Sequence, residues 1–107
     1  MSEQAVIELN DSNFDDVVKN AKVPVLVDFT ATWCGPCKAI GKIVEQIAVE
    51  GAGRILVAKV DIEDSPKVAA RFGVRAVPTV VVFRGGSPVG HRLGLSTKAK
   101  LLELAAT

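Results

Sequence analysis

Trp33-Cys34-Gly35-Pro36-Cys37-Lys38 contains both cysteines of the 107-residue chain. The stretch follows an apolar run, residues 23–29, that is typical of a buried strand, and it opens a segment with the apolar spacing of a helix. Side chains three residues apart on a helix have Cβ atoms roughly 5–6 Å apart, so a small adjustment allows a disulfide. The free N–H groups and the dipole of a first helical turn favour a thiolate there. The stretch can therefore hold two thiols or one disulfide, with one sulfur biased towards the reactive anion.

The overall composition is that of a globular protein. The chain is 49% apolar and 23% charged, and at this length we expect a single domain over residues 1–107 that needs no disulfide to fold. A net charge of +1 gives no reason to expect nucleic acid or an anionic membrane as the main partner. Residues 1–4 lack the features of a signal peptide, and apolar runs such as 77–83 are too short to span a bilayer. These observations favour a reducing cytosol, where a disulfide is more often catalytic than structural.

Predicted strands and helices alternate along the chain. Gly85-Gly86 indicates a hairpin between the last two strands, and Pro88 indicates that the last strand is an edge strand. Helix caps are expected within residues 10–13, at Ser65, and at Ser96 or Thr97. Strands are expected at residues 6–9, 25–29, 55–60, 79–83 and 89–93, and helices at 14–21, from Pro36 to a stop at Gly51 or Gly53, from Pro66 to Gly73, and after residue 97. The order βαβαβαββα predicts an α/β fold, a mixed sheet with helices on both faces.

Four motifs at matching intervals resemble the thioredoxin family: Val27-Asp28-Phe29, the six-residue cysteine stretch, Val77-Pro78-Thr79, and the glycines Gly86 and Gly94. The resemblance runs from about residue 5 to the C-terminus. It implies the thioredoxin fold, a five-stranded mixed sheet flanked by four helices, and activity as a general protein-disulfide reductase. It also implies a reversible Cys34–Cys37 disulfide without a bound cofactor, and as partners a thioredoxin reductase and disulfide-containing proteins. We expect a cytoplasmic monomer that binds neither nucleic acid nor membrane.

Redox chemistry is the favoured interpretation of the two cysteines. A structural disulfide closing so short a loop contributes only roughly 2 kcal/mol. A closed zinc site needs four ligands, and the chain offers Cys34, Cys37 and the single histidine, His91, so no metal is expected. Cys34 precedes the helix, its sulfur should be the more exposed, and it is the predicted nucleophile. Cys37 lies inside the first turn and is predicted to resolve the mixed disulfide.

Asp28 interrupts a strand that is otherwise apolar. Burial of a carboxylate is costly and raises its pKa, unless the side chain simply reaches water at the strand end. The resemblance implies the first arrangement, a buried Asp28 below Cys37 that accepts the Cys37 proton. Lys59, in a neighbouring predicted strand, could approach Asp28 or could extend to solvent.

The resemblance also implies a surface that binds substrates. Pro78 resembles the family's cis-proline, although a trans proline at the start of a strand is the alternative. A cis bond would place the Val77 backbone beside Cys34, free to pair with an extended substrate. Trp33 is predicted to shield the site and contact partners instead of joining the core. By analogy with the family, the apolar rim is completed by Gly35, Pro36, Ala76, Val77, Leu93 and Gly94, with Ile62 beside them.

Two residues depart from the family pattern, and two other functions stay open. Thr30 stands where thioredoxins usually have tryptophan. Lys42 stands where many have a helix-kinking proline, so either a straighter helix is expected or packing preserves the kink. A disulfide oxidase or isomerase of the same fold usually carries histidine at the position of Pro36 and a secretion signal. A binding module whose cysteines only switch affinity is the second alternative. Replacing both cysteines with serine would abolish reductase activity but leave a binding module's partner interaction intact.

Overall fold

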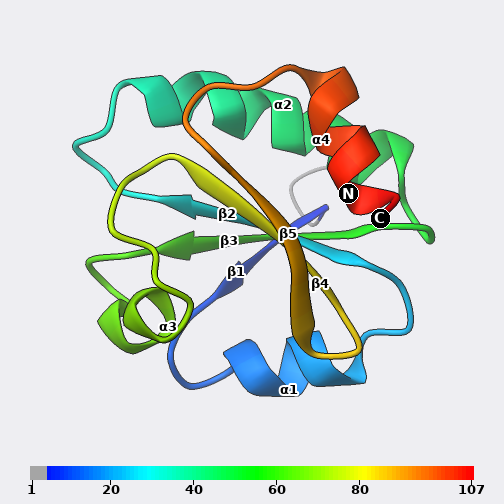
Figure 1. Ribbon diagram of the computed structural model, residues 1–107, viewed down its shortest axis with the longest axis horizontal. Coiled ribbons are helices and arrows are strands. Elements are labelled where there is room, and N and C mark those ends of the chain that lie inside the picture. Colours follow the sequence, from blue (N-terminus) through cyan, green and yellow to red (C-terminus); the bar gives the residue numbers. More distant parts are fainter. Residues whose placement is uncertain (1–4) are drawn as a thin grey trace.

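The computed structural model describes residues 5–107. Within this range five strands form one sheet, and four helices cover its two faces (Figure 1). The strands are β1 (Val6–Leu9), β2 (Val25–Thr30), β3 (Leu56–Asp61), β4 (Thr79–Arg84) and β5 (Ser87–Leu93). The helices are α1 (Phe14–Asn20), α2 (Pro36–Glu50), α3 (Pro66–Arg71) and α4 (Lys98–Ala105). The predicted α/β fold with its five-stranded mixed sheet is confirmed.

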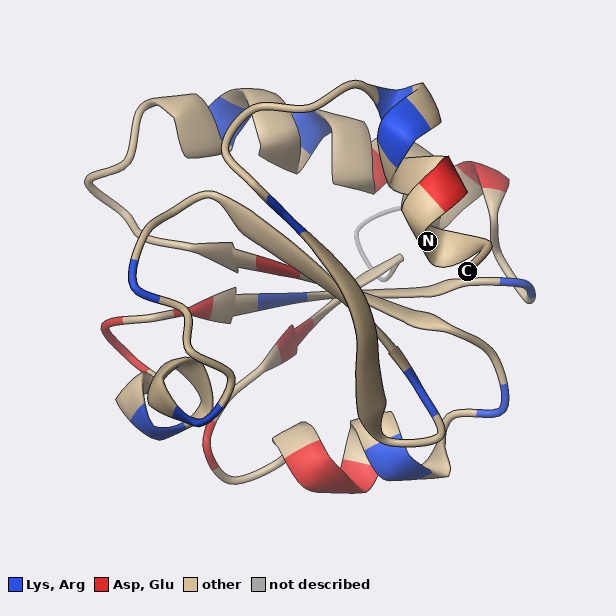
Figure 2. Cartoon of the chain, in the orientation of Figure 1, with Lys and Arg blue, Asp and Glu red and all other residues tan. Residues whose placement is uncertain are grey.

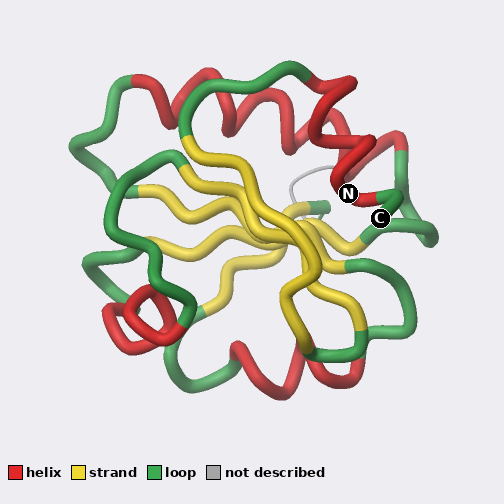
Figure 3. Tube along the Cα trace, viewed as in Figure 1, coloured by secondary structure: helices red, strands yellow, loops and turns green. Residues whose placement is uncertain are grey.

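The sheet has the strand order β1-β3-β2-β4-β5, with β2 in the centre. β3 pairs in parallel with both β1 and β2, whereas β4 pairs antiparallel with β2 and β5. Figure 3 shows this sheet as a layer between helices, and Figure 1 places α2 and α4 on one face and α1 and α3 on the other. Alternate residues of β2 enter the two cores: Leu26 packs with the α2 side, and Val27 and Phe29 pack with the α1 side. Asp28 lies two residues after Leu26 on the same strand, so its side chain points to the same face of the sheet, towards α2.

The closing hairpin differs from the prediction at one end. Gly85 and Gly86 both have positive φ, +58° and +87°, which a two-residue hairpin turn requires and glycine adopts readily. β5 is an edge strand, as predicted, but it begins at Ser87 and includes Pro88. The register shifts between Val82 and Phe83, so the strand bulges and the proline, which has no N–H, can be accommodated there.

The cap predicted at Ser65 is wrong. The Ser65 hydroxyl is buried without a hydrogen-bond partner among the described residues, and the N-terminus of α3 is capped from a distant loop instead. Asp11, which precedes α1, accepts hydrogen bonds from the backbone N–H groups of Lys67 (3.4 Å) and Val68 (2.9 Å). Local sequence cannot reveal a cap whose donor and acceptor are more than 50 residues apart.

Other predicted ends of helices differ less. Within residues 10–13 the asparagine side chains bond to backbone N–H groups of their own turn, and none of them caps α1 directly. Thr97 caps α4 by accepting a hydrogen bond from the N–H of Lys100, as one of the two alternatives predicted. α2 continues unbroken through Lys42 and ends at Glu50, before Gly51.

Two further expectations concern membranes and targeting. Among residues 5–107 no helix is both long enough and apolar enough to span a membrane. The interpretation that residues 1–4 are not part of a signal peptide lies outside the described residues.

Candidate active site

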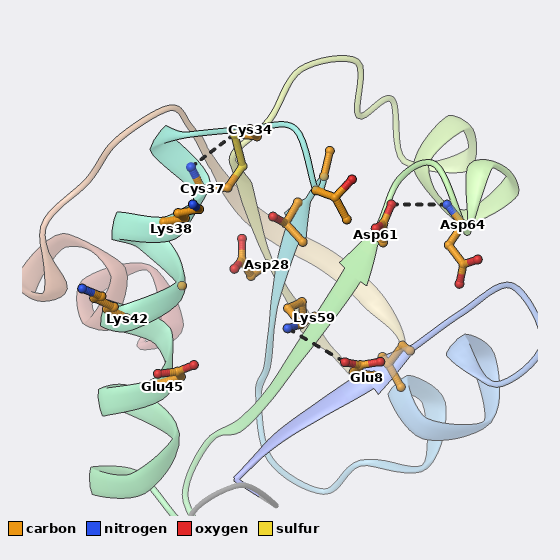
Figure 4. A pocket seen from close by; sticks show the side chains of 15 residues that line it. Glu8, Asp28, Cys34, Cys37, Lys38, Lys42, Glu45, Lys59, Asp61 and Asp64 are labelled. Atoms are coloured by element: carbon orange, nitrogen blue, oxygen red, sulfur yellow. Dashed lines mark hydrogen bonds and ion pairs between the residues drawn. A yellow bond between two sulfur atoms is a disulfide. The ribbon is translucent and has the colours of Figure 1, made fainter.

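Cys34 and Cys37 form a disulfide at the N-terminal end of α2, just beyond the end of β2 (Figure 4). Their Cα atoms are 5.4 Å apart. Pro36 is the first residue of α2, where its missing N–H costs no hydrogen bond, and it places Cys37 in the first turn. The helix therefore brings the two sulfurs together at its positive end.

The surroundings of the two sulfurs differ in hydrogen bonding. The backbone N–H of Cys37 donates a hydrogen bond to the Cys34 sulfur at 3.2 Å. The sulfur thus takes the place of the side-chain oxygen that caps many helices, at the point where the helix dipole also favours negative charge. A donor of this kind stabilises a thiolate on Cys34 relative to the thiol.

Exposure does not distinguish the two cysteines in the oxidised state. As whole residues, Cys34 is 6% exposed and Cys37 is 4% exposed, so both are buried; that the Cys34 sulfur is the more exposed of the two stays a prediction. Both pack against Ala31, and the partly buried side chains of Ile62 and Val77 close this small cluster. The disulfide holds both cysteines in one apolar cluster, which explains why the two residues are almost equally buried.

Asp28 is buried below the cysteines. It is 1% exposed, and its Oδ1 atom has no hydrogen-bond partner among the described residues. Burial raises the pKa of Asp28 from 3.8 to about 6, and the positive charge of Lys59 opposes this rise. Asp28, Cys37 and Lys59 line the same hollow (Figure 4). The alternative that Asp28 simply reaches water at the strand end is therefore wrong.

Lys59 lies between two acidic side chains. Its position on β3 is in register with Asp28 on β2 and with Glu8 on β1. Its side chain is 44% exposed, and its Nζ atom is 3.9 Å from Glu8 Oε2. Lys59 extends to solvent, and its positive charge lowers the pKa of Asp28 without an ion pair between the two among the described residues, so a close approach of Lys59 to Asp28 stays a prediction. Glu8 was not among the predicted residues, because only the pairing of β1 with β3 brings it to this site.

The residues of the predicted substrate rim are accessible. The Val77–Pro78 peptide bond is cis, as the resemblance implied. Gly94, at φ +87°, donates its N–H to the carbonyl of Pro78 at 2.8 Å, so the loop after β5 is held beside the cis bond. Trp33 is 64% exposed and does not belong to the core, and Leu93 is 66% exposed.

The remaining predicted residues surround this centre. Gly35, Pro36 and Ala76 are exposed, and Ala76 and Leu93 line a groove between the end of α3 and β5. His91 is exposed on β5 and lines that groove, not the hollow over Asp28. Residues 5–107 contain no group of three or more histidine, cysteine, aspartate or glutamate side chains that could hold a metal ion.

The hollow over Asp28 also contains both departures from the family pattern. Thr30, at the end of β2, and Lys42, on α2, contribute to its lining. The other polar side chains and the glycine that complete the lining were not predicted as site residues: Glu8, Thr32, Lys38, Gly41, Glu45, Asp61 and Asp64. They come from separate strands, loops and one helix, so only the folded chain brings them all together.

Comparison with known proteins gives one consistent result. A family model described as Thioredoxin matches residues 5–107. The thioredoxin of Haemophilus influenzae is 40% identical over 96 residues, which are 90% of this chain and 90% of that protein. A thioredoxin of Mycobacterium tuberculosis is 44% identical over 98 residues, 92% of this chain and 84% of that protein. A bifunctional thioredoxin reductase/thioredoxin of Mycobacterium leprae is 45% identical over 96 residues, 90% of this chain and 21% of that protein.

Proposed function

The chain belongs to the thioredoxin family and is a protein-disulfide reductase that works by dithiol–disulfide exchange, and we propose that Cys34 is its nucleophile, Cys37 its resolving thiol and Asp28 its proton acceptor. The observation that carries this assignment is the hydrogen bond from the Cys37 N–H to the Cys34 sulfur. It supports an anion on Cys34 in the reduced protein, and both cysteines line the hollow that contains Asp28, whose carboxyl group has a raised pKa.

In the first step the Cys34 thiolate attacks one sulfur of a substrate disulfide. A bond forms between Cys34 and that sulfur, the substrate disulfide breaks, and the other substrate sulfur leaves as a thiolate. The helix N-terminus and the Cys37 N–H stabilise the attacking anion.

In the second step Cys37 gives its proton to Asp28 and attacks the Cys34 sulfur. The Cys34–Cys37 disulfide forms, the bond between Cys34 and the substrate sulfur breaks, and that substrate sulfur leaves as a thiolate that takes up a proton. Two electrons have then passed from the cysteine pair to the substrate. A base with a pKa near 6 suits this task, because it is ionised at neutral pH and still binds a proton readily.

Substrates bind, in this proposal, across the exposed rim around the cysteines. Trp33 and Leu93 provide apolar contact area, and the Val77 backbone beside the cis bond pairs with an extended substrate segment. Gly35, Pro36, Ala76 and Gly94 complete the rim, and Lys59 supports the site through Asp28. A rim with few polar side chains requires little more of a substrate than an accessible disulfide, which suits a general reductase.

A thioredoxin reductase is the proposed source of electrons. The Mycobacterium leprae relative is named for both activities, which supports a functional pairing of the two kinds of protein. We further propose a single-domain monomer that acts in the cytoplasm. The reversible disulfide provides the redox chemistry without a bound cofactor.

The assignment is tested by insulin reduction with dithiothreitol as the electron source. The wild-type protein should exceed the uncatalysed rate, and Cys37→Ser should accumulate a mixed disulfide that peptide mapping places on Cys34. The matched control is Cys34→Ser, which should trap no substrate. An adduct on Cys37 of the C34S protein, with none on Cys34 of the C37S protein, would reverse the two roles.

A further inference from the structure

Three charged residues lie in a row across three neighbouring strands. Glu8 on β1 is in register with Lys59 on β3, and Lys59 is in register with Asp28 on β2. Figure 2 shows the acidic, basic and acidic bands on β1, β3 and β2, and Figure 4 shows the three side chains at the same hollow. In-register residues of parallel strands point to the same face, so both carboxyl groups compete for one ammonium group.

The ammonium group of Lys59 lies towards the outer carboxylate. Lys59 Nζ is 3.9 Å from Glu8 Oε2, and among the described residues this is the ion pair recorded for Lys59. The Glu8 side chain is 83% exposed and Asp28 is 1% exposed. An ammonium group beside Glu8 keeps its water shell, whereas one bonded to Asp28 would have to be desolvated.

We propose that Glu8 is a positioning residue for disulfide reduction: it holds the Lys59 ammonium group near the edge of the sheet and away from the Asp28 carboxyl group. The inference rests on the proposed role of Asp28 as the proton acceptor. Without Glu8, Lys59 would turn inward, where its charge stabilises the Asp28 carboxylate more strongly. Asp28 would then be a weaker base for the Cys37 proton.

Other charged groups also face Asp28 or share its side of the sheet. From α2 they are Lys38, Lys42 and Glu45, from β3 Lys59 and Asp61, from β1 Glu8, from the loop after β3 Asp64, and from β5 Arg92, which is in register with Val80 beside Asp28. Glu8 differs from the other acids in being the one paired with the lysine next to Asp28. Its influence should therefore depend on Lys59.

The test measures the pKa of the Asp28 carboxyl group in the oxidised protein, by NMR of the labelled carboxyl carbon. In Glu8→Gln this pKa should fall by about 0.5, the size expected of an exposed charge pair. The fall should disappear in a Lys59→Met background and should shrink in high salt. The matched control is Glu45→Gln, which removes an acid from the same hollow without touching the Lys59 pair, and whose effect should not depend on Lys59.

Two results would overturn the inference. One is an unchanged Asp28 pKa in Glu8→Gln, and the other is an equal fall with and without Lys59, which would show direct repulsion between the two acids. In the reductase assay, the acidic limb of the pH profile should move in Glu8→Gln by the same amount as the Asp28 pKa. A pKa that moves while the profile stays fixed would leave Glu8 holding Lys59 but would refute Asp28 as the proton acceptor, and with it the positioning role in catalysis.

Discussion

Replacing Asp28 with asparagine should make the stability of this protein less dependent on pH. The Asp28 carboxyl group is 1% exposed and has a pKa of about 6 in the folded chain, against 3.8 for the ordinary group. Its ionisation therefore favours the unfolded state. The sign follows from proton binding: between these two pH values the folded chain holds the proton more tightly, so stability falls as the pH rises. Below pH 3.8 the penalty is absent, and above pH 6 it is complete.

The expected size follows from the difference between the two pKa values. Each pKa unit corresponds to about 1.4 kcal/mol, so the full penalty is roughly 3 kcal/mol, of which about 2 kcal/mol develops between about pH 4.5 and about pH 8. An asparagine amide is neutral over this range. Its own burial changes the free energy of unfolding by the same amount at both pH values and cancels in the comparison.

Urea unfolding of the oxidised proteins at the two pH values measures the effect, because the disulfide cysteines do not titrate. Relative to wild type, Asp28→Asn should gain about 2 kcal/mol of stability as the pH rises from 4.5 to 8. Glu103→Gln removes an exposed acid on α4 and provides the control, with a change of less than about 0.5 kcal/mol. A stability difference between Asp28→Asn and wild type that is the same at both pH values would refute the buried, raised-pKa carboxyl group.

Three further predictions concern turnover, the distant helix cap and the substrate rim. Asp28→Asn should slow insulin reduction most near neutral pH, where the wild-type carboxylate is ionised. The two rates should approach each other below about pH 6, where Asp28 is protonated in the wild type, and at alkaline pH, where solvent can take the Cys37 proton; a uniform loss across a pH–rate profile would contradict this. Asp11→Ala should cost about 1 kcal/mol in urea unfolding because α3 loses its cap. Ser65→Ala should be neutral or stabilising, since its buried hydroxyl has no partner among residues 5–107, and the reverse ranking of the two variants would be evidence against the assigned cap. Trp33→Ala should raise KM for protein disulfides several-fold but change the free energy of unfolding by less than about 0.5 kcal/mol, because Trp33 is 64% exposed. A large loss of stability would show that Trp33 packs in the core instead.

The elements that could be predicted are those with strong local patterns. The apolar periodicity of α2, the continuous apolar run of β2 and the Gly85-Gly86 turn each identify their element without tertiary information. The predicted start of the last strand, residue 89, differs from the observed start of β5, because a bulge opposite Phe83 lets the pairing continue to Ser87. A bulge depends on how two strands match in length, which no single strand reveals.

In the candidate site, too, some features are visible in the local sequence and others depend on contacts between distant segments. An acid within a covered strand is visible in the sequence, and together with the family resemblance it predicts that Asp28 is buried. The ion pair between Lys59 and Glu8 cannot be predicted from the local sequence, because Glu8 is distant along the chain and reaches the site only through the register of β1 on β3. The cap that Asp11 provides for α3 depends on the same kind of long-range contact, which the local sequence does not indicate.

By itself the sequence determined that Cys34-Gly35-Pro36-Cys37 opens a helix behind a buried strand, because thiol spacing, proline at the first helical position and apolar periodicity are all local properties. Tertiary structure alone decided the environment of those thiols. The two cysteines are almost equally buried as residues, and a carboxyl group lies below them in a row of three charges. Burial, strand register and long-range electrostatics set proton affinities, and each arises from segments that meet only when the chain folds.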